Sequence, residues 1–402
     1  MGNEITSVLV IGNTPIKGIG GAVVHTIRVL CAINRQERLL VFMVLPGDTG
    51  YIKALHNLIK SQKCPSIKLL QYKDLDIITR THSPYFISLL YIYRLVRSII
   101  EIIKHRRIIG FVDAAISSSQ YLHDTIPILI ASLFSKRKVR KIVYVHGMPY
   151  SKGRNLFSRL YYTLSIRMLK KFDVIFTVNN IINNYLKRAL KSETRISVTS
   201  NGVPAEYVIN RIELHDWIKR KYDLGFLGNI SMLKGGKDLL VILKIVLTLR
   251  PKTKVLIIGA TPPWFISYLE KLGVKQQVEL AGPIYDDHVK YQLLRQIKVF
   301  TFPSHEETWG IAIAEALASG CVIVTYDLPV YRMIFKDSLT ITSEHSCKDM
   351  VKVVLGLLSA IDKHEYERLN AYLKQTKKGL ELVRKQYTWD VVAAREIKGL
   401  KN

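Results

Sequence analysis

Two glutamates near residue 310 have the chemistry of a sugar or nucleotide site. Glu307 and Glu315 are about two helical turns apart, and Ile311 to Ser319 has the small, apolar residues of a helix that packs on a sheet. The free backbone amides at the start of such a helix bind anions, and a carboxylate accepts hydrogen bonds from neighbouring hydroxyls. We therefore predict a phosphate or sugar site at this helix start. The predicted amide donors are Thr308, Trp309, Gly310 and Ile311.

The segments on either side place this helix start at the edge of a parallel sheet. Ile297 to Phe302 before it and Val322 to Thr325 after it are apolar and rich in β-branched residues, as buried strands are. Gly320 is the expected left-handed terminator of the helix between them. Strand, loop, helix and strand in this order predict an α/β domain, in which ligands bind beyond the carboxyl ends of the strands.

The residues around the two glutamates resemble the signature of a known enzyme family. From Pro303 to Gly320 the chain reads Pro-Ser-x-x-Glu-x-x-Gly-x-x-x-x-Glu-Ala-x-Ala-x-Gly. This pattern is similar to the signature of glycosyltransferase family 4, the retaining nucleotide-sugar transferases with the two-domain GT-B fold. The resemblance implies that Glu315 binds the ribose hydroxyls, that Glu307 contacts the donor sugar and that residues 308–311 bind the diphosphate. The alternative is an ordinary βαβ unit with two exposed glutamates.

Three further positions are similar to positions of the same family. The pair Gly20 and Gly21 follows the first predicted strand, as does the family's glycine loop, which faces the donor. Lys234 stands before two glycines at the opening of a helix, where a lysine suits a diphosphate. His146 follows a predicted strand at 141–145 and resembles the family's histidine that contacts the donor sugar, although a single histidine is usually structural.

The predicted donor site departs from the family pattern at Asn229. The family usually has an arginine at this position, so the resemblance leaves one diphosphate cation missing here. Lys237 or Lys17 is the candidate substitute. Otherwise donor binding is expected to be weaker than in the family.

We expect neither a metal nor another cofactor, since the nucleoside diphosphate sugar is itself a substrate. Asp74-Leu75-Asp76 resembles the metal motif of the other glycosyltransferase fold, but it lacks that motif's context and is interpreted as exposed loop acids. The cysteines lie far apart and form no Cys-x-x-Cys pair, so neither a zinc site nor a disulfide framework is indicated. A reducing interior is then the default. The four cysteines are Cys31, Cys64, Cys321 and Cys347.

Length and composition predict two globular domains. The chain has 402 residues, of which 48% are hydrophobic, which is long for a single core. We expect an α/β protein of the GT-B type, with two doubly wound, Rossmann-like domains facing a central cleft. Residues 1–204 would form the acceptor-side domain and 205–384 the nucleotide-sugar-binding domain. The family resemblance implies that 385–402 form a helix returning to the first domain.

The chain is strongly basic. Its net charge of +27 implies attraction to anionic membranes, nucleic acid or charged glycans. Residues 85–109 have the pattern of a basic amphipathic helix, and a second basic run follows at 136–141. Such a helix either lies on an anionic membrane or covers the sheet with a solvated basic face. In the membrane interpretation the residues at the headgroups are Arg94, Arg97, Lys104, Arg106 and Arg107, and those at the interface are Tyr85, Phe86, Tyr91 and Tyr93.

The function predicted from these residues is retaining transfer of a hexosyl group from a nucleoside diphosphate sugar to a lipid-linked, glycan or protein acceptor. One alternative is a hydrolase or epimerase of nucleotide sugars on the same fold. Another is a basic protein that binds or modifies nucleic acid, but the positive residues are dispersed and no nucleic-acid motif occurs, which disfavours a nucleic-acid partner. No charge-free apolar stretch reaches the ~18 residues that span a bilayer, so a cytoplasmic protein, free or peripheral on the membrane, is expected. The nucleobase, the sugar and the oligomeric state are left open.

Overall fold

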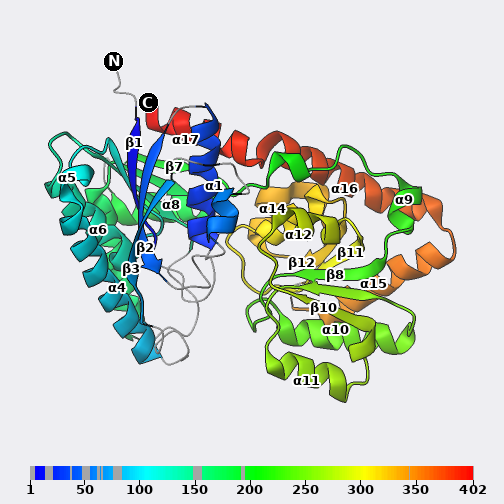
Figure 1. Ribbon diagram of the computed structural model, residues 1–402. Helices are drawn as coiled ribbons and strands as arrows, with labels where there is room; N and C mark the ends of the chain where they lie inside the picture. Colours follow the sequence, from blue (N-terminus) through cyan, green and yellow to red (C-terminus); the bar gives the residue numbers. More distant parts are fainter. Residues whose placement is uncertain are drawn as a thin grey trace. The chain divides into compact units, whose positions relative to one another are not determined.

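The computed structural model describes residues 5–13, 21–36, 39–47, 55–60, 64, 67–75, 84–147, 156–191, 195–343 and 345–401 (Figure 1). The chain divides into two compact units. Unit 1 comprises Met1–Asn201 and Val392–Asn402, and unit 2 comprises Gly202–Val391. The domain boundaries predicted after 204 and after 384 stay predictions, and the structure divides the chain a few residues from each.

Unit 1 is built on a sheet of seven parallel strands in the order β3-β2-β1-β4-β5-β6-β7. The central strands are apolar and buried, as helix-covered parallel strands must be. The elements are β1 (Ser7–Ile11), α1 (Gly21–Gln36), β2 (Leu40–Gly47), β3 (Ile67–Lys73), α4 (Pro84–Lys104), α5 (Arg106–Ile109), β4 (Ala114–Ser117), α6 (Leu122–Leu133), β5 (Arg140–Val145), α7 (Leu156–Met168), β6 (Val174–Thr177), α8 (Asn180–Leu190), β7 (Arg195–Val198) and, from Val392 onward, α17 (Trp389–Lys401).

Unit 2 is built on a sheet of six parallel strands in the order β10-β9-β8-β11-β12-β13. Its elements are α9 (Leu214–Ile218), β8 (Tyr222–Leu227), α10 (Gly236–Leu249), β9 (Val255–Ile258), α11 (Pro263–Lys271), β10 (Val278–Gly282), α12 (Asp287–Leu294), β11 (Ile297–Phe302), α13 (Ile311–Ala318), β12 (Val322–Tyr326), α14 (Pro329–Phe335), β13 (Thr340–Thr342), α15 (Cys347–Asp362) and α16 (Tyr366–Gln386). The strands and helix predicted around the two glutamates are β11, α13 and β12, and Gly320 has the expected left-handed conformation with φ of 72°.

The two sheets share one strand order over their first six strands, which confirms the predicted pair of doubly wound α/β domains. In each sheet the first strand of the unit lies in the interior, and the order reverses between it and the fourth strand. Loops at this reversal point diverge above and below the sheet and leave room for a ligand. In unit 1 these loops follow β1 and β4, and in unit 2 they follow β8 and β11. The cleft expected between the units stays a prediction.

The expectation of no disulfide is wrong for one pair of cysteines. Cys31 of α1 is bonded to Cys64, with their Cα atoms 5.5 Å apart. The two residues are separated by 33 positions in the chain, so only the fold brings them together, and spacing carries no signal for it. Cys321 and Cys347 are free thiols. In the described ranges no group of His, Cys, Asp and Glu side chains could hold a metal ion.

Candidate functional site

Two loops at the reversal point of unit 2 are joined by backbone contacts. The loop after β11 reaches the loop after β8 through two hydrogen bonds to the carbonyl of Leu233, from the amide of His305 at 2.9 Å and from Ser304 Oγ at 3.2 Å. Gly235 makes this approach possible. Its φ is 69°, and a Cβ at this position would lie 1.8 Å from the carbonyl oxygen of Pro303. The loops therefore form one rigid edge, and only glycine fits at its closest point.

Lys234 and Glu307 meet at this edge. Lys234 Nζ donates to Glu307 Oε1, and Ser304 Oγ lies 3.4 Å from the same oxygen. The carboxylate side chain is 9% exposed, whereas that of the lysine is 34% exposed. The lysine predicted for a diphosphate and the glutamate predicted for a sugar are thus brought together. An anion that binds Lys234 must compete with Glu307 for the ammonium group.

Helix α13 begins beside this ion pair. Gly310 precedes its first residue with φ of 95° and, as a glycine, brings no capping side chain of its own. Backbone amides at a helix start, with the positive end of the helix dipole, suit an anion. The side chain of Trp309 is 2% exposed and packs edge-to-face on Phe335 and Tyr387, with ring centroids 5.6 Å and 5.1 Å away. Trp309 therefore anchors the helix start by its side chain, which leaves its backbone to serve a ligand.

The second predicted glutamate has a partner that sequence reasoning missed. Lys290 of α12 donates to Glu315 Oε1 at 2.5 Å, and its Nζ also lies 2.9 Å from Asp287 Oδ1. Glu315 is 9% exposed. Nothing in the sequence distinguishes this lysine among 59 lysines and arginines, because its contact joins two separate helices. Ribose hydroxyls at Glu315 would share the carboxylate with an ammonium group.

Asn229 ties two loops of unit 2 together. Its Oδ1 accepts a hydrogen bond of 3.2 Å from the amide of Ala260, which follows β9. The neighbouring backbones also come close, since a Cβ on Gly259 would lie 2.2 Å from the carbonyl oxygen of Gly228. Lys237 is exposed on α10, and Lys17 lies outside the described residues.

In unit 1 the predicted histidine follows β5, as expected. Among the described residues no hydrogen-bond partner meets its buried Nε2. Burial holds the pKa of His146 well below its usual value, the neighbouring His25 lowers it further, and a hydrogen bond to the backbone of Ser118 opposes both. The ring is therefore neutral near pH 7. Gly21 begins α1, whereas Gly20 lies outside the described residues.

A buried polar network at the end of β1 corrects two predictions. Asp74 and Arg94 form an ion pair of 2.6 Å with side chains 1% and 2% exposed, and Arg94 donates to the carbonyl of Asn13 at 2.7 Å. Asp74 is therefore neither an exposed loop acid nor an open metal ligand, and Arg94 cannot reach lipid headgroups. The reason is that α4 turns Arg94 toward the end of β3, where its guanidinium neutralises the buried carboxylate of Asp74. Asp76 lies outside the described residues.

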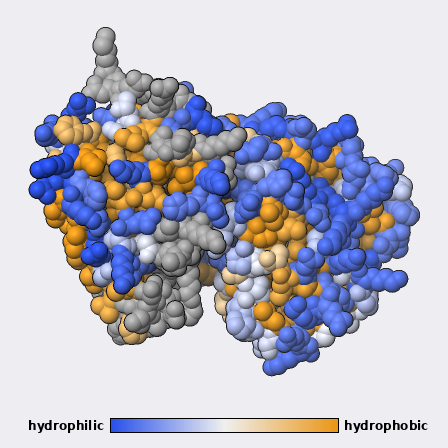
Figure 2. Space-filling model, in the orientation of Figure 1, coloured by the Kyte–Doolittle hydropathy of each residue, from blue (hydrophilic) through white to orange (hydrophobic). Residues whose placement is uncertain are grey.

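The opposite face of α4 carries an apolar stripe. Side chains three or four residues apart are 42–57% exposed there, and Figure 2 shows hydrophobic side chains gathered along this edge of unit 1. The apolar stripe consists of Phe86, Leu89, Ile92, Val96, Ile100 and Ile103. Of the predicted interfacial aromatics, Tyr91 instead stacks on His123 at 4.1 Å, and Tyr93 donates to the carbonyl of Lys73. Tyr85 has no described side chain.

The two predicted basic runs meet at one end of this stripe. The amide of Lys136 donates to the carbonyl of Gly110 at 3.0 Å, which holds residues 136–141 against the turn after α5. Lys136 Nζ lies 5.0 Å from the ring centre of Phe111. These segments carry exposed apolar side chains, Leu133 among them at 80%, as well as exposed cations. The exposed cations are Lys104, Arg106, Arg107, Lys136, Arg137, Lys138 and Arg140.

Two family models match consecutive parts of the chain. "Glycosyltransferase Family 4" matches residues 19–207, and "Glycosyl transferases group 1" matches residues 212–376. No curated protein sequence matches the chain. The first match covers most of unit 1 and the second most of unit 2. The second match contains Lys234, Glu307 and Glu315.

Solved glycosyltransferase structures share the fold across almost the whole chain. HepE of Anabaena, in complex with UDP and glucose, is similar with a TM-score of 0.73 at 12% identity, covering 99% of this chain and 100% of the other. Sucrose-phosphate synthase of Thermosynechococcus elongatus gives 0.73 at 12% identity, with 98% of each chain covered. TarM of S. aureus, in complex with UDP, α-GlcNAc-glycerol and fondaparinux, gives 0.73 at 11%, covering 99% and 100%. The chain therefore belongs to the glycosyltransferases of the family 4 type and has the GT-B fold.

Proposed function

We propose that the protein transfers a hexosyl group, with retention, from a nucleoside diphosphate sugar to an acceptor hydroxyl. The observation that carries this proposal is the ion pair of Lys234 and Glu307 beside the start of α13. One cation and a helix start suit a diphosphate, and the adjacent carboxylate suits sugar hydroxyls. The similar structures of HepE and TarM contain UDP, which supports a donor of this class.

In the proposed reaction the bond between the sugar and the diphosphate breaks, and negative charge builds on the leaving phosphate. Lys234 and the amides of residues 308–311 would stabilise that charge, which is the electrostatic route to rate. Glu307, released from Lys234 by the incoming phosphate, would bind sugar hydroxyls, and Glu315 would bind those of the ribose. His146 would accept a hydrogen bond from the sugar through Nε2. Neither a metal nor a cofactor is assigned a role.

Substituting the lysine and substituting the glutamate of the ion pair should affect UDP binding differently, which makes a test. Lys234→Met removes a charged donor, so UDP binding measured by isothermal titration should weaken roughly 10- to 100-fold. Glu307→Gln releases Lys234 from its competitor, so UDP should bind as well as to wild type or better, while sugar transfer falls. Lys244→Met, at an exposed lysine of α10, is the matched control and should change neither. Wild-type UDP affinity in Lys234→Met contradicts the assignment.

A second measurement separates transfer from the other reactions of this fold. Donor is supplied with and without an acceptor mixture, and free sugar, free nucleotide and glycosylated product are quantified. A transferase consumes donor mainly when acceptor is present. Equal consumption without acceptor would instead establish a hydrolase, and a changed sugar still attached to the nucleotide would establish an epimerase.

We also propose that the protein works on an anionic membrane surface, with a lipid-linked acceptor. The support is the apolar stripe of α4 with cations gathered at its end, since apolar side chains enter the headgroup region while lysines and arginines contact anionic lipids. A single exposed apolar residue needs no explanation, but a continuous row does. No described helix combines the length and the apolar character needed to cross a bilayer.

Co-sedimentation with phosphatidylglycerol vesicles tests the membrane proposal. Each cation near the headgroups contributes about 1 kcal/mol, so replacing Lys136, Arg137 and Lys138 by glutamine should weaken binding roughly a hundredfold. Leu89→Ser with Ile92→Ser should weaken it even at high salt, where charge is screened. Leu249→Ser, 63% exposed in unit 2, is the control. Wild-type sedimentation of both sets of variants would show that α4 only covers the sheet.

A further inference from the structure

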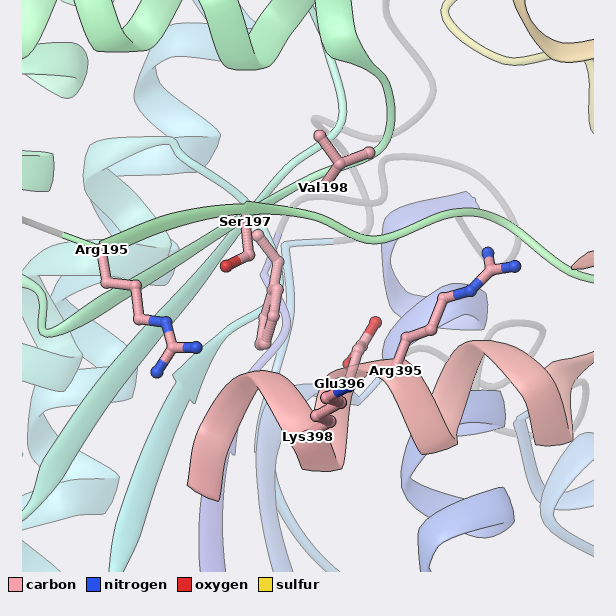
Figure 3. Close-up of a pocket in the computed structure, with 7 residues that line it drawn as sticks. Arg195, Ser197, Val198, Arg395, Glu396 and Lys398 are labelled. Atoms are coloured by element: carbon pink, nitrogen blue, oxygen red, sulfur yellow. The ribbon is translucent and has the colours of Figure 1, made fainter. Parts of the chain in front are cut away.

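A carboxylate from the last helix is buried in the core of unit 1. Glu396 of α17 is 1% exposed, and Figure 3 shows it rising from α17 toward the strand that carries Ser197, whereas Arg395 points to one side. Its Oε2 accepts from Tyr144 Oη and its Oε1 from Thr199 Oγ1. An ionised carboxylate at such a site needs a positive partner as well as hydroxyl donors.

His25 of α1 is placed to be that partner. It is fully buried, its Nε2 lies 3.4 Å from Glu396 Oε1, and its Nδ1 lies 2.9 Å from Oδ1 of Asn201. Nδ1 is therefore at hydrogen-bond distance from an amide oxygen, and Nε2 is at ion-pair distance from a carboxylate oxygen. The groups described around the ring are Glu396 of α17, Tyr144 of β5, His146 directly after β5, and Asn201 in the segment after β7.

The same ring stands against the histidine predicted to contact the donor sugar. The centroids of His25 and His146 are 5.1 Å apart with the planes at 72°, and the ring of Tyr144 touches both, at 4.9 Å and 5.9 Å. A positive charge at this distance opposes a second one on His146. The lowered pKa of His146, with burial as the main cause and His25 as the next, agrees with that arrangement.

We propose that His25, held between Glu396 and Asn201, is a charged positioning residue that fixes the ring of His146 and keeps it neutral, so that His146 Nε2 accepts a hydrogen bond from a substrate hydroxyl. The kinetic part of this inference rests on the proposed transferase function. Glu396 then acts at the sugar site without touching substrate, by supplying the counter-charge to His25. A purely structural role, in which Glu396 only docks α17 on unit 1, would affect stability and leave His146 unchanged.

The direct test is the protonation state of both rings in the wild-type chain. Nitrogen chemical shifts are recorded on protein labelled at its 11 histidines, with His25→Gln and His146→Gln for assignment. At pH 7 His25 should show two protonated nitrogens, and His146 should show one protonated nitrogen and one bare one. A neutral His25 at pH 7, or a charged His146, overturns the proposal. This measurement needs no turnover, so it stays readable if the protein transfers no sugar.

The kinetic test uses a variant that keeps the shape of the buried group. Glu396→Gln removes the counter-charge, so His25 becomes neutral and His146 protonates more readily. Transfer should stay within about threefold of wild type at pH 8, and its loss on acidification should begin at a higher pH than in wild type. Tyr144→Phe removes a hydrogen bond to the same carboxylate without changing charge, and its pH profile should match that of wild type. If folded Glu396→Gln shows the same pH dependence of transfer as wild type, the role of Glu396 as counter-charge to His25 is refuted.

Discussion

Lowering the pH should reduce the free energy of unfolding of unit 1, because one buried histidine cannot take up a proton in the folded state. His123 of α6 is 2% exposed, stacks on Tyr91 at 4.1 Å and has its Nδ1 2.8 Å from the hydroxyl oxygen of Tyr161. Burial, with a smaller effect of the Arg94 charge, lowers the pKa of His123 to about 3. The folded protein therefore leaves this ring neutral at pH values where the unfolded chain protonates it.

The sign and size of the effect follow from linkage. The unfolded ring has a pKa of about 6.5, so below that pH the unfolded state binds a proton that the folded state does not, and unfolding is favoured. The contribution of His123 to stability is complete above about pH 6.5 and is lost as the pH falls toward 3. Between pH 7 and pH 4.5 the loss in the free energy of unfolding is about 2.5 kcal/mol.

Urea unfolding of wild type and His123→Gln at the two pH values checks this number. All four tryptophans belong to unit 2, so tryptophan fluorescence follows that unit, and circular dichroism follows both. His123→Gln loses the ring contacts at every pH, but wild type should lose about 2.5 kcal/mol more than this variant on acidification, in the transition that fluorescence does not report. His215→Gln, whose ring is 76% exposed, should behave as wild type. Equal pH dependence in wild type and His123→Gln would refute the reasoning.

Three further outcomes are expected. Gly235→Ala puts a Cβ against the carbonyl of Pro303 in a left-handed conformation, so unit 2 should lose at least 1–3 kcal/mol in urea unfolding and bind UDP less tightly. Asn229→Arg restores the cation that the family pattern expects, so isothermal titration should show about tenfold tighter UDP binding, and unchanged affinity would mean that another group already fills that place. Arg94→Met leaves Asp74 buried without its counter-charge and should cost about 3–5 kcal/mol, most of which Asp74→Leu in the same chain should restore; a small loss for the single variant would contradict the buried pair.

The local pattern around α13 was predictable because its signals are short-range. Apolar runs specify β11 and β12, small residues specify the helix between them, and Gly320 ends it with φ of 72°. The reversal of strand order then brings together Lys234 and Glu307, two residues that the family resemblance assigns to one donor site. The sequence thus predicts the fold of unit 2, and the assignment of these charged groups to a donor site stays a prediction.

Contacts between distant residues were not predictable in the same way. Arg94 has the spacing of a surface cation, and only the packing of α4 against β3 shows that it neutralises Asp74. Lys290 and Glu396 likewise acquire their roles from partners on other elements. The disulfide of Cys31 and Cys64 closes over 33 residues without a local motif. Each of these depends on a tertiary neighbour, which spacing within one segment does not encode.

The division of unit 1 between two ends of the chain has a consequence for synthesis. Residues up to Asn201 leave the ribosome first, but Glu396 follows about 200 residues later, which at 5–20 residues per second takes roughly 10–40 s. Throughout that interval His25, Tyr144 and Thr199 have no carboxylate to bind. Unit 2, which is continuous in sequence, can be finished earlier. Unit 1, whose larger part is translated first, is therefore the last unit to complete its core. A nascent chain stalled before Glu396 should expose the incomplete core of unit 1 to chaperones.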